Sequence, residues 1–225
     1  MGKFISLYKQ FLSPGDLCFD IGSNFGNRTR CFAQMGCKVV AVEPRLSCYN
    51  MMSKTFHGNG NVRLVKAAVG RQSGKARLHT SPDHVLSTLS ESFMDVTKRS
   101  GRFSEAMWNH IENVEMITLD QLIQDYGIPD FIKIDVEGYE SEVMAGLSHP
   151  VTALSLEWVP ELPDNALKSL EKLVELGNYE FNLSWGESMR FSRPNWRSLK
   201  SILAVIGEFE GDSEHFGDIY ARLRK

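Results

Sequence analysis

Two carboxylates stand at the ends of short apolar runs, where a sheet protein places its chemistry. Asp20 closes an apolar run over residues 17–19, and Glu43 closes a second one over residues 39–42. Such runs are typical of buried parallel strands, whose carboxyl ends meet at the edge of the sheet where ligands bind. An acid at the tip of the second strand can accept hydrogen bonds from both hydroxyls of a ribose. Glu43 is therefore a candidate nucleoside-binding residue.

A glycine loop between the two runs predicts where the rest of such a ligand binds. Gly22 and Gly26 stand at its ends, and Ser23 and Asn24 lie between them. Glycine lets backbone amides approach a ligand where a Cβ atom would clash. The helix predicted after the loop directs free N–H groups into the same crevice. All four residues are candidate cofactor-binding residues.

The spacing of these residues separates two classes of nucleoside cofactor. A nicotinamide site prefers G-x-G-x-x-G, whose third glycine is missing from the pattern Asp20-x-Gly22-x-x-x-Gly26. The carboxylate of Asp20 would repel a pyrophosphate but could bind the ammonium of an amino acid. S-adenosylmethionine carries adenosine at one end and an amino acid at the other. The pattern, with Glu43, therefore resembles motif I of class I methyltransferases, and a NAD-dependent oxidoreductase is the less favoured alternative.

The second informative stretch is a strand that carries charge, FIKIDVEGYE over residues 131–140. A central parallel strand should be apolar, yet alternation places Lys133 and Asp135 on one face. The next predicted strand ends in Glu157. We expect Asp135, Glu137 and Glu157 to converge near the sulfonium of the cofactor and the acceptor. The alternative for Lys133 is a buried ion pair that only offsets desolvation.

One α/β domain over residues 1–225 is predicted to position these groups. The chain is 42% hydrophobic, enough for one sizeable core. Strands separated by helices predict a class I methyltransferase-like doubly wound sheet, mostly parallel with one antiparallel terminal strand. Residues 62–69 are predicted to form the third strand, and the tip around Ala68 should lie beside the adenine.

Two long excursions, residues 81–113 and 186–216, interrupt this economical pattern. Long segments of this kind in a compact domain are usually functional. Residues 103–111 in the first excursion show helical spacing. We expect the two excursions to flank one acceptor pocket, with His84 or Trp196 near its rim.

Composition and cysteine usage exclude several other classes of protein. The net charge is −3, so neither nucleic acid nor a membrane surface is expected as a partner. No apolar stretch approaches the roughly 20 residues that cross a bilayer, and the N-terminus lacks a signal peptide. The four cysteines form no C-x-x-C and have no histidine cluster beside them, so a zinc site is disfavoured. Reduced thiols and a cytoplasmic location are the expectation.

Five motifs together carry a resemblance to a known family. They are, in order, FDIGSNFG, AVEP, TLDQL, DFIKIDVEGYE and LSLEW. Over residues 18–158 the chain resembles the FkbM family of S-adenosylmethionine-dependent methyltransferases. The resemblance implies O-methylation of a hydroxyl on a sugar or natural-product small molecule. Because residues 81–113 and 186–216 match nothing in the family pattern, the acceptor is not inherited, and a non-catalytic S-adenosylmethionine-binding module is the alternative.

Methyl transfer to an alcohol requires that the acceptor oxygen be aligned behind the methyl carbon and that a base remove the hydroxyl proton. The candidate catalytic residues are Asp135, Glu157 and His84, with His79 as a further histidine beside the first excursion. Asp135 and Glu157 could also offer hard oxygen ligands to Mg²⁺. No third ligand is evident from the spacing, so no metal site is predicted.

Overall fold

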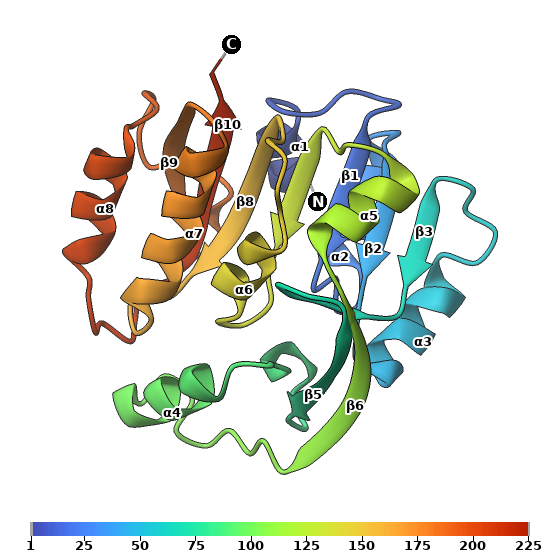
Figure 1. Cartoon of the computed structure of the whole chain (residues 1–225), viewed down its shortest axis with the longest axis horizontal. Coiled ribbons are helices and arrows are strands. Elements are labelled where there is room, and N and C mark those ends of the chain that lie inside the picture. The colour runs from blue at the N-terminus through green and yellow to red at the C-terminus, as the bar shows by residue number, and fades with distance from the viewer. Residues whose placement is uncertain (1, 225) are drawn as a thin grey trace.

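The computed structural model describes residues 2–224 and contains a main sheet of seven strands (Figure 1). In spatial order the strands are β3 (Val62–Val65), β2 (Lys38–Val42), β1 (Leu17–Ile21), β7 (Phe131–Ile134), β8 (Ala153–Trp158), β10 (Gly217–Leu223) and β9 (Tyr179–Trp185). All neighbours pair in parallel except β10, which is antiparallel to both β8 and β9. The predicted fold class is confirmed, and the antiparallel strand is the last in the chain.

Helices cover both faces of the main sheet (Figure 1). One face packs against α1 (Gly2–Tyr8), α2 (Asn27–Gln34) and α3 (Leu46–Thr55). The other packs against α5 (Leu119–Tyr126), α6 (Glu140–Ala145), α7 (Pro163–Leu176) and α8 (Leu199–Gly207). The two apolar clusters between these layers explain why the central strands read as continuous apolar runs.

Helix α7 shows how directly the sequence specifies an element. Pro163 occupies its first turn, where a missing N–H is tolerated. Ala166, Leu170 and Leu173 recur at helical spacing and are buried against the sheet. Gly177 ends the helix as predicted: it is the C-cap residue, and its N–H donates to the carbonyl oxygen of Leu173.

A second, three-stranded sheet lies at the edge where the parallel strands of the main sheet end (Figure 1). It contains β4 (Ala68–Val69), β6 (His110–Ile117) and β5 (Gly74–Thr80). The single strand predicted over residues 62–69 is therefore wrong. Residues 62–65 stay in the main sheet, while Ala68 and Val69 pair with β6. The break carries the chain from one sheet to the other.

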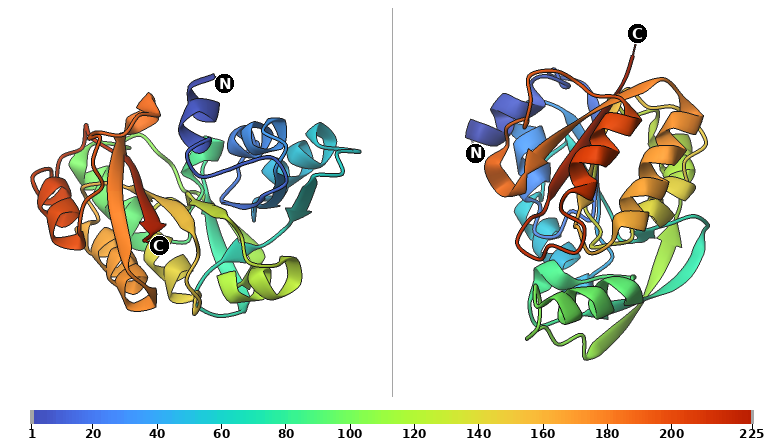
Figure 2. Two further views of the ribbon diagram at one scale, coloured as in Figure 1. Left: turned by 90° about the horizontal axis from the view of Figure 1, so that it is seen from above. Right: turned by 90° about the vertical axis from the view of Figure 1, so that its left-hand side faces the viewer.

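The first excursion folds onto this small sheet (Figure 2, right). It contains a 3-10 turn, η1 (His84–Leu86), and α4 (Glu91–Ser100), whose first turn is capped by the Ser90 hydroxyl. The helical spacing at residues 103–111 is misleading, because His110 and Ile111 belong to β6. The second excursion contains a further 3-10 turn, η2 (Gly186–Ser188), and α8. In the described part of the chain, every helix is too short or too polar to span a bilayer.

Candidate functional site

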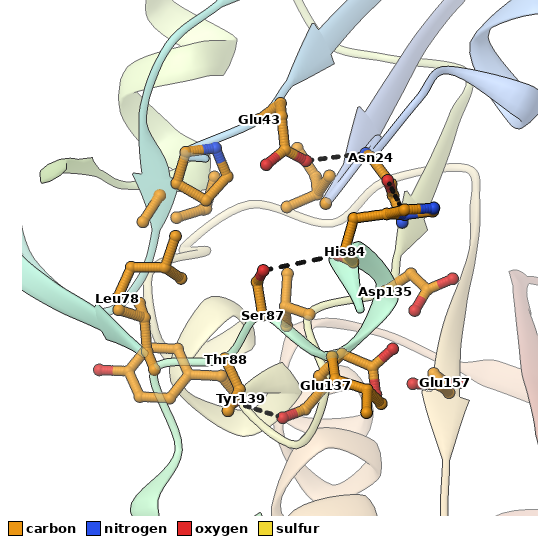
Figure 3. A pocket seen from close by; sticks show the side chains of 18 of the residues that line it. Asn24, Glu43, Leu78, His84, Ser87, Thr88, Asp135, Glu137, Tyr139 and Glu157 are labelled. Atoms are coloured by element: carbon orange, nitrogen blue, oxygen red, sulfur yellow. Dashed lines mark hydrogen bonds between the residues drawn. The ribbon is translucent and has the colours of Figure 1, made fainter. Parts of the chain in front are cut away.

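A cavity of about 450 Å³ lies at the carboxyl ends of β1, β2, β7 and β8 (Figure 3). The main sheet and the loops that follow its strands contribute Gly22, Asn24, Glu43, Asp135 and Glu157 to its wall. Its volume is in the range of small-molecule and cofactor sites. The sequence placed these five residues at a site, and the structure brings them to one cavity.

Glu43 is held by the chain around it at one side of the cavity. The backbone N–H of Asn24 donates to its Oε2 at 2.7 Å, and that of Arg45 donates to its Oε1 at 2.8 Å. Burial raises the pKa of the Glu43 carboxyl to about 7, although these two backbone donors oppose the rise. Each carboxylate oxygen still has a lone pair for a ligand hydroxyl. The arrangement suits a ribose.

The glycines of the loop are required by the packing of the chain against itself. A Cβ atom on Gly22 would lie 1.8 Å from the carbonyl oxygen of Asp135, and φ at Gly22 is +77°. A Cβ atom on Gly26 would lie 2.6 Å from the ring of Phe56, the C-cap residue of α3. Gly22 thus lets β1 and β7 converge beneath the cavity, whereas sequence reasoning had assigned both glycines to ligand approach.

Three of the predicted cofactor residues do not line the cavity. Asp20 is buried and accepts a hydrogen bond from the Thr29 hydroxyl of α2. The hydroxyl of Ser23 donates to the carbonyl oxygen of Val42 at 3.2 Å. Asp20, Ser23 and Gly26 therefore hold the loop in shape. The structure does not bring the Asp20 carboxylate to the cavity where an ammonium would be bound.

Ala68 lines the cavity although the strand predicted to carry it is interrupted. It lies beside Ala67 and Val69, and Leu78 of β5 lines the same cavity. These apolar groups form a surface on which a flat base can lie. The predicted placement near an adenine is compatible with this wall.

Three carboxylates meet at the other side of the cavity from Glu43 (Figure 3). One oxygen each of Asp135, Glu137 and Glu157 lies within 4.8 Å of the others, as the sequence predicted. Burial, followed by repulsion from the neighbouring carboxylates, raises the pKa of Glu137 and Glu157 well above the usual range. Glu137 also adds a third oxygen donor to Asp135 and Glu157, the two residues considered as ligands for Mg²⁺. The cluster can take up a proton or face a cation.

Lys133 forms the ion pair that the sequence left open. Its Nζ lies 2.7 Å from Oδ1 of Asp218 and 3.2 Å from Oδ2 of Asp135. Burial by itself lowers the pKa of Lys133, but Asp135 and Asp218 raise it well above its ordinary value. Lys133 is therefore a buried cation that fixes Asp135 at the floor of the cavity.

Asp218 was missed by the sequence reasoning, although a signal for it exists. It lies in β10 directly opposite Glu157 of β8 and shares its face of the sheet. A carboxylate in a buried strand needs a partner, which alternation alone does not identify. That partner is Lys133 of β7, which β8 separates from β10 in the sheet.

The histidines occupy different places from one another. Nδ1 of His84 lies 2.9 Å from Oδ1 of Asn24, and the His84 ring lies 3.9 Å from that of Phe25 between centroids. His84 thus lines the cavity on the side of the glycine loop. His79 does not line the cavity and forms a β-bridge with Thr88, which does.

Both excursions reach the cavity, as expected. Arg102 and Phe103 come from the first, and Glu187 and Phe216 come from the second. Of the two residues predicted as alternatives for the rim, His84 lines the cavity, whereas Trp196 lies elsewhere and packs between Phe11 and Phe191. Arg102 and Phe103 have no periodicity or motif that could have singled them out.

The fold and the cavity together define a protein with the class I methyltransferase architecture. Precorrin-6y C5,15-methyltransferase from Geobacter metallireducens GS-15 has a similar structure, with a TM-score of 0.51 and 14% sequence identity. The comparison covers 99% of this chain and 86% of that one. At this identity the likeness concerns the fold alone.

The chain belongs to the family of FkbM methyltransferase domains, whose model matches residues 20–174. It is also similar to the hexuronic acid methyltransferase AglP of Haloferax volcanii, at 24% identity over 159 residues. That match covers 67% of this chain and 58% of the relative, so this chain corresponds to little more than half of its length.

Proposed function

We propose that this protein is an S-adenosylmethionine-dependent methyltransferase that methylates a hydroxyl of a sugar or related small molecule. The observation that carries the proposal is one cavity with Glu43 on one side and the carboxylates Asp135, Glu137 and Glu157 on the other. The family supports methyl transfer, and the relative named for hexuronic acid supports a sugar as acceptor.

The residues present fit the cofactor at the adenosyl end. Glu43 would accept the ribose hydroxyls, Ala68 would lie against the adenine, and Gly22 and Asn24 would border the remainder. When bound, S-adenosylmethionine supplies a methyl group already activated by its sulfonium. The protein then has to align the acceptor oxygen, exclude water and accept one proton.

We assign the proton to Glu157. Burial among carboxylates raises the pKa of both Glu137 and Glu157, which makes either one a stronger base when it is ionised. We choose Glu157 because it is fixed on strand β8, whereas Glu137 lies in the loop after β7. The ionised Glu157 carboxylate would accept the proton that the acceptor hydroxyl loses during methyl transfer. Asp135 is held by Lys133 and is suited to positioning. His84 is bonded to Asn24 and is suited to ordering the glycine loop.

The same three carboxylates offer Mg²⁺ as an alternative means of activating the hydroxyl. The two possibilities separate on dialysis against a chelator. With Glu157 as the base, turnover survives the treatment. Turnover that disappears and returns only with added Mg²⁺ would replace the base with a metal site.

Calorimetric titration with S-adenosylhomocysteine and with NAD tests the cofactor. We expect binding of the first and none of the second, and the reverse result would favour the oxidoreductase. Methyl transfer from labelled S-adenosylmethionine to a panel of methyl glycosides then tests catalysis. Binding without any turnover on a broad panel would favour the non-catalytic module. A cytoplasmic location is part of the proposal and agrees with four cysteines that are all free.

A further inference from the structure

Arg102 makes an unusual set of contacts for a residue on an irregular segment. Its Nε lies 2.7 Å from Oε1 of Glu161, and its second guanidinium nitrogen lies 3.1 Å from Oε2. The side chains of Arg102 and Glu161 are only 9% and 3% exposed. A buried bidentate pair of this kind is strong and fixes the orientation of both groups.

The same guanidinium also holds the loop before β10. It donates to the carbonyl oxygens of Asp212 at 3.3 Å and of His215 at 2.5 Å. The Cζ atom of the Arg102 guanidinium lies 5.9 Å from the centroid of the Phe216 ring. Arg102 therefore connects the first excursion to the second, and Glu161 connects both to the loop after β8.

The turn that Arg102 holds is itself well ordered by hydrogen bonds. The Asp212 carboxylate accepts from the backbone N–H groups of Glu214 and His215, at 2.6 and 3.0 Å. The carbonyl of Phe216 accepts from the N–H of Gly186 at 2.8 Å. Movement of this turn would displace Phe216, which lines the cavity.

We propose that Arg102 is a positioning residue that joins the two excursions into one wall of the acceptor pocket. It thereby sets the position of Phe103 and Phe216 relative to the carboxylate Glu157. This inference rests on the proposed function, because it takes the wall to face the acceptor. The cofactor side of the cavity, around Glu43, is outside its reach.

The test has to separate positioning from folding. Removing Arg102 alone leaves Glu161 buried without its cation, which is strongly destabilising. The double variant Arg102→Met with Glu161→Leu replaces the pair with apolar groups of similar size, a change that is often neutral or stabilising. The matched control is Arg71→Met with Glu142→Leu. That pair is also bidentate, at 2.5 and 2.8 Å, but it is more exposed to solvent and neither residue lines the cavity.

Backbone amide exchange over residues 212–216 is the first measurement. In the Arg102 and Glu161 double variant we expect exchange to accelerate by about tenfold or more. A small loss in the free energy of local unfolding is enough to produce a tenfold faster exchange. Exchange in the control variant should match the unmodified protein. Unchanged exchange in both variants would overturn the inference.

Kinetics are the second measurement, with any methyl glycoside that the unmodified protein accepts. We expect KM for the glycoside to rise about tenfold while kcat and the affinity for S-adenosylhomocysteine change about twofold or less. An unchanged KM would also overturn the inference. Failure of the unmodified protein to bind S-adenosylhomocysteine, or to methylate any glycoside, would instead count against the proposed function. The exchange measurement would then decide alone whether Arg102 joins the two excursions.

Discussion

At the scale of single residues, Glu43 combines a binding role with a pKa that makes the role depend on pH. Burial raises the pKa of its carboxyl to about 7. Only the ionised form offers acceptors to both ribose hydroxyls, so the deprotonated protein binds the cofactor. The affinity for S-adenosylhomocysteine should therefore increase as pH rises through about 7, by about tenfold per unit below that value.

Titration calorimetry across this pH range checks the prediction. Glu43→Ala should bind about 1–3 kcal/mol more weakly above pH 7 and lose the pH dependence. The control is Glu112→Ala, which removes a carboxylate that accepts from the Leu46 N–H outside the cavity. Equal affinities for the Glu43 variant and the unmodified protein would contradict the ribose assignment.

Gly22 provides a prediction about stability at a single position. In Gly22→Ala the new methyl carbon meets the Asp135 carbonyl oxygen at 1.8 Å, so strands β1 and β7 must separate. Gly58 has a similar φ of +75° with no atom within 4 Å of an added Cβ. Gly58→Ala should thus cost only the backbone strain of about 1–2 kcal/mol, and Gly22→Ala considerably more. Urea unfolding of the two variants compares them, and equal losses would contradict the packing role.

The sequence identified the chemistry of the site better than the placement of each group. Glu43, Asp135 and Glu157 could be named because strand ends in an α/β sheet share an edge. The prediction that Asp20 reaches the cavity is wrong, because spacing does not show that its carboxylate accepts a hydrogen bond from the Thr29 hydroxyl. Arg102 could not be found, since its partners lie far along the chain.

At the scale of elements, strands and helices with local signals were predictable and those with distant partners were not. Helix α7 carries its own start, its apolar spacing and its end. The apolar stretch over residues 62–69 reads as one strand, yet its second half pairs with β6. Alternation says which residues share a face but not which strand lies beside them.

The ion pair between β7 and β10 gives a prediction at this scale. Lys133→Met would leave Asp135 and Asp218 without their buried cation, at a loss of about 3–5 kcal/mol in the free energy of unfolding. Without Lys133 the pKa of Asp218 lies higher in the folded protein than in the unfolded chain. A raised carboxyl pKa costs stability as pH rises, so the loss should be larger near pH 8 than near pH 5.

Chemical unfolding at the two pH values checks this dependence. The control is Lys172→Met, which removes a partly exposed lysine 3.9 Å from the exposed Glu175. Exposed pairs contribute about 0–1 kcal/mol, so this variant should be nearly neutral at both pH values. If Lys133→Met lowers the free energy of unfolding equally near pH 5 and near pH 8, Asp218 is not left as a buried charge in the variant.

At the scale of the whole molecule, the cavity collects carboxyl groups, and the surrounding fold supplies cationic partners for only some of them. Lys133 pairs with Asp135, and Arg28 pairs with Glu187 at the other border of the cavity. In the described part of the chain, Glu137 and Glu157 have no cationic partner within ion-pair distance. The guanidinium of Arg102 lines the cavity but is engaged by Glu161.

This charge distribution predicts which acceptors the protein prefers, if the proposed function holds. Burial raises the pKa of Glu137 and Glu157, so their charge is present at a pH high enough to ionise them. There a carboxylate on the acceptor would be repelled, and repulsion between unit charges near a protein surface amounts to a few kcal/mol at about 4 Å. Neutral methyl hexosides should thus have a kcat/KM about tenfold or more above that of the corresponding hexuronides, since 1.4 kcal/mol corresponds to a factor of ten.

Competition between paired neutral and acidic glycosides, with labelled S-adenosylmethionine, measures the ratio. Glu137→Gln removes one charge while leaving the proposed base Glu157 in place, so it should narrow the preference. A preference for the hexuronide, the acceptor type in the name of the curated relative, would contradict this prediction.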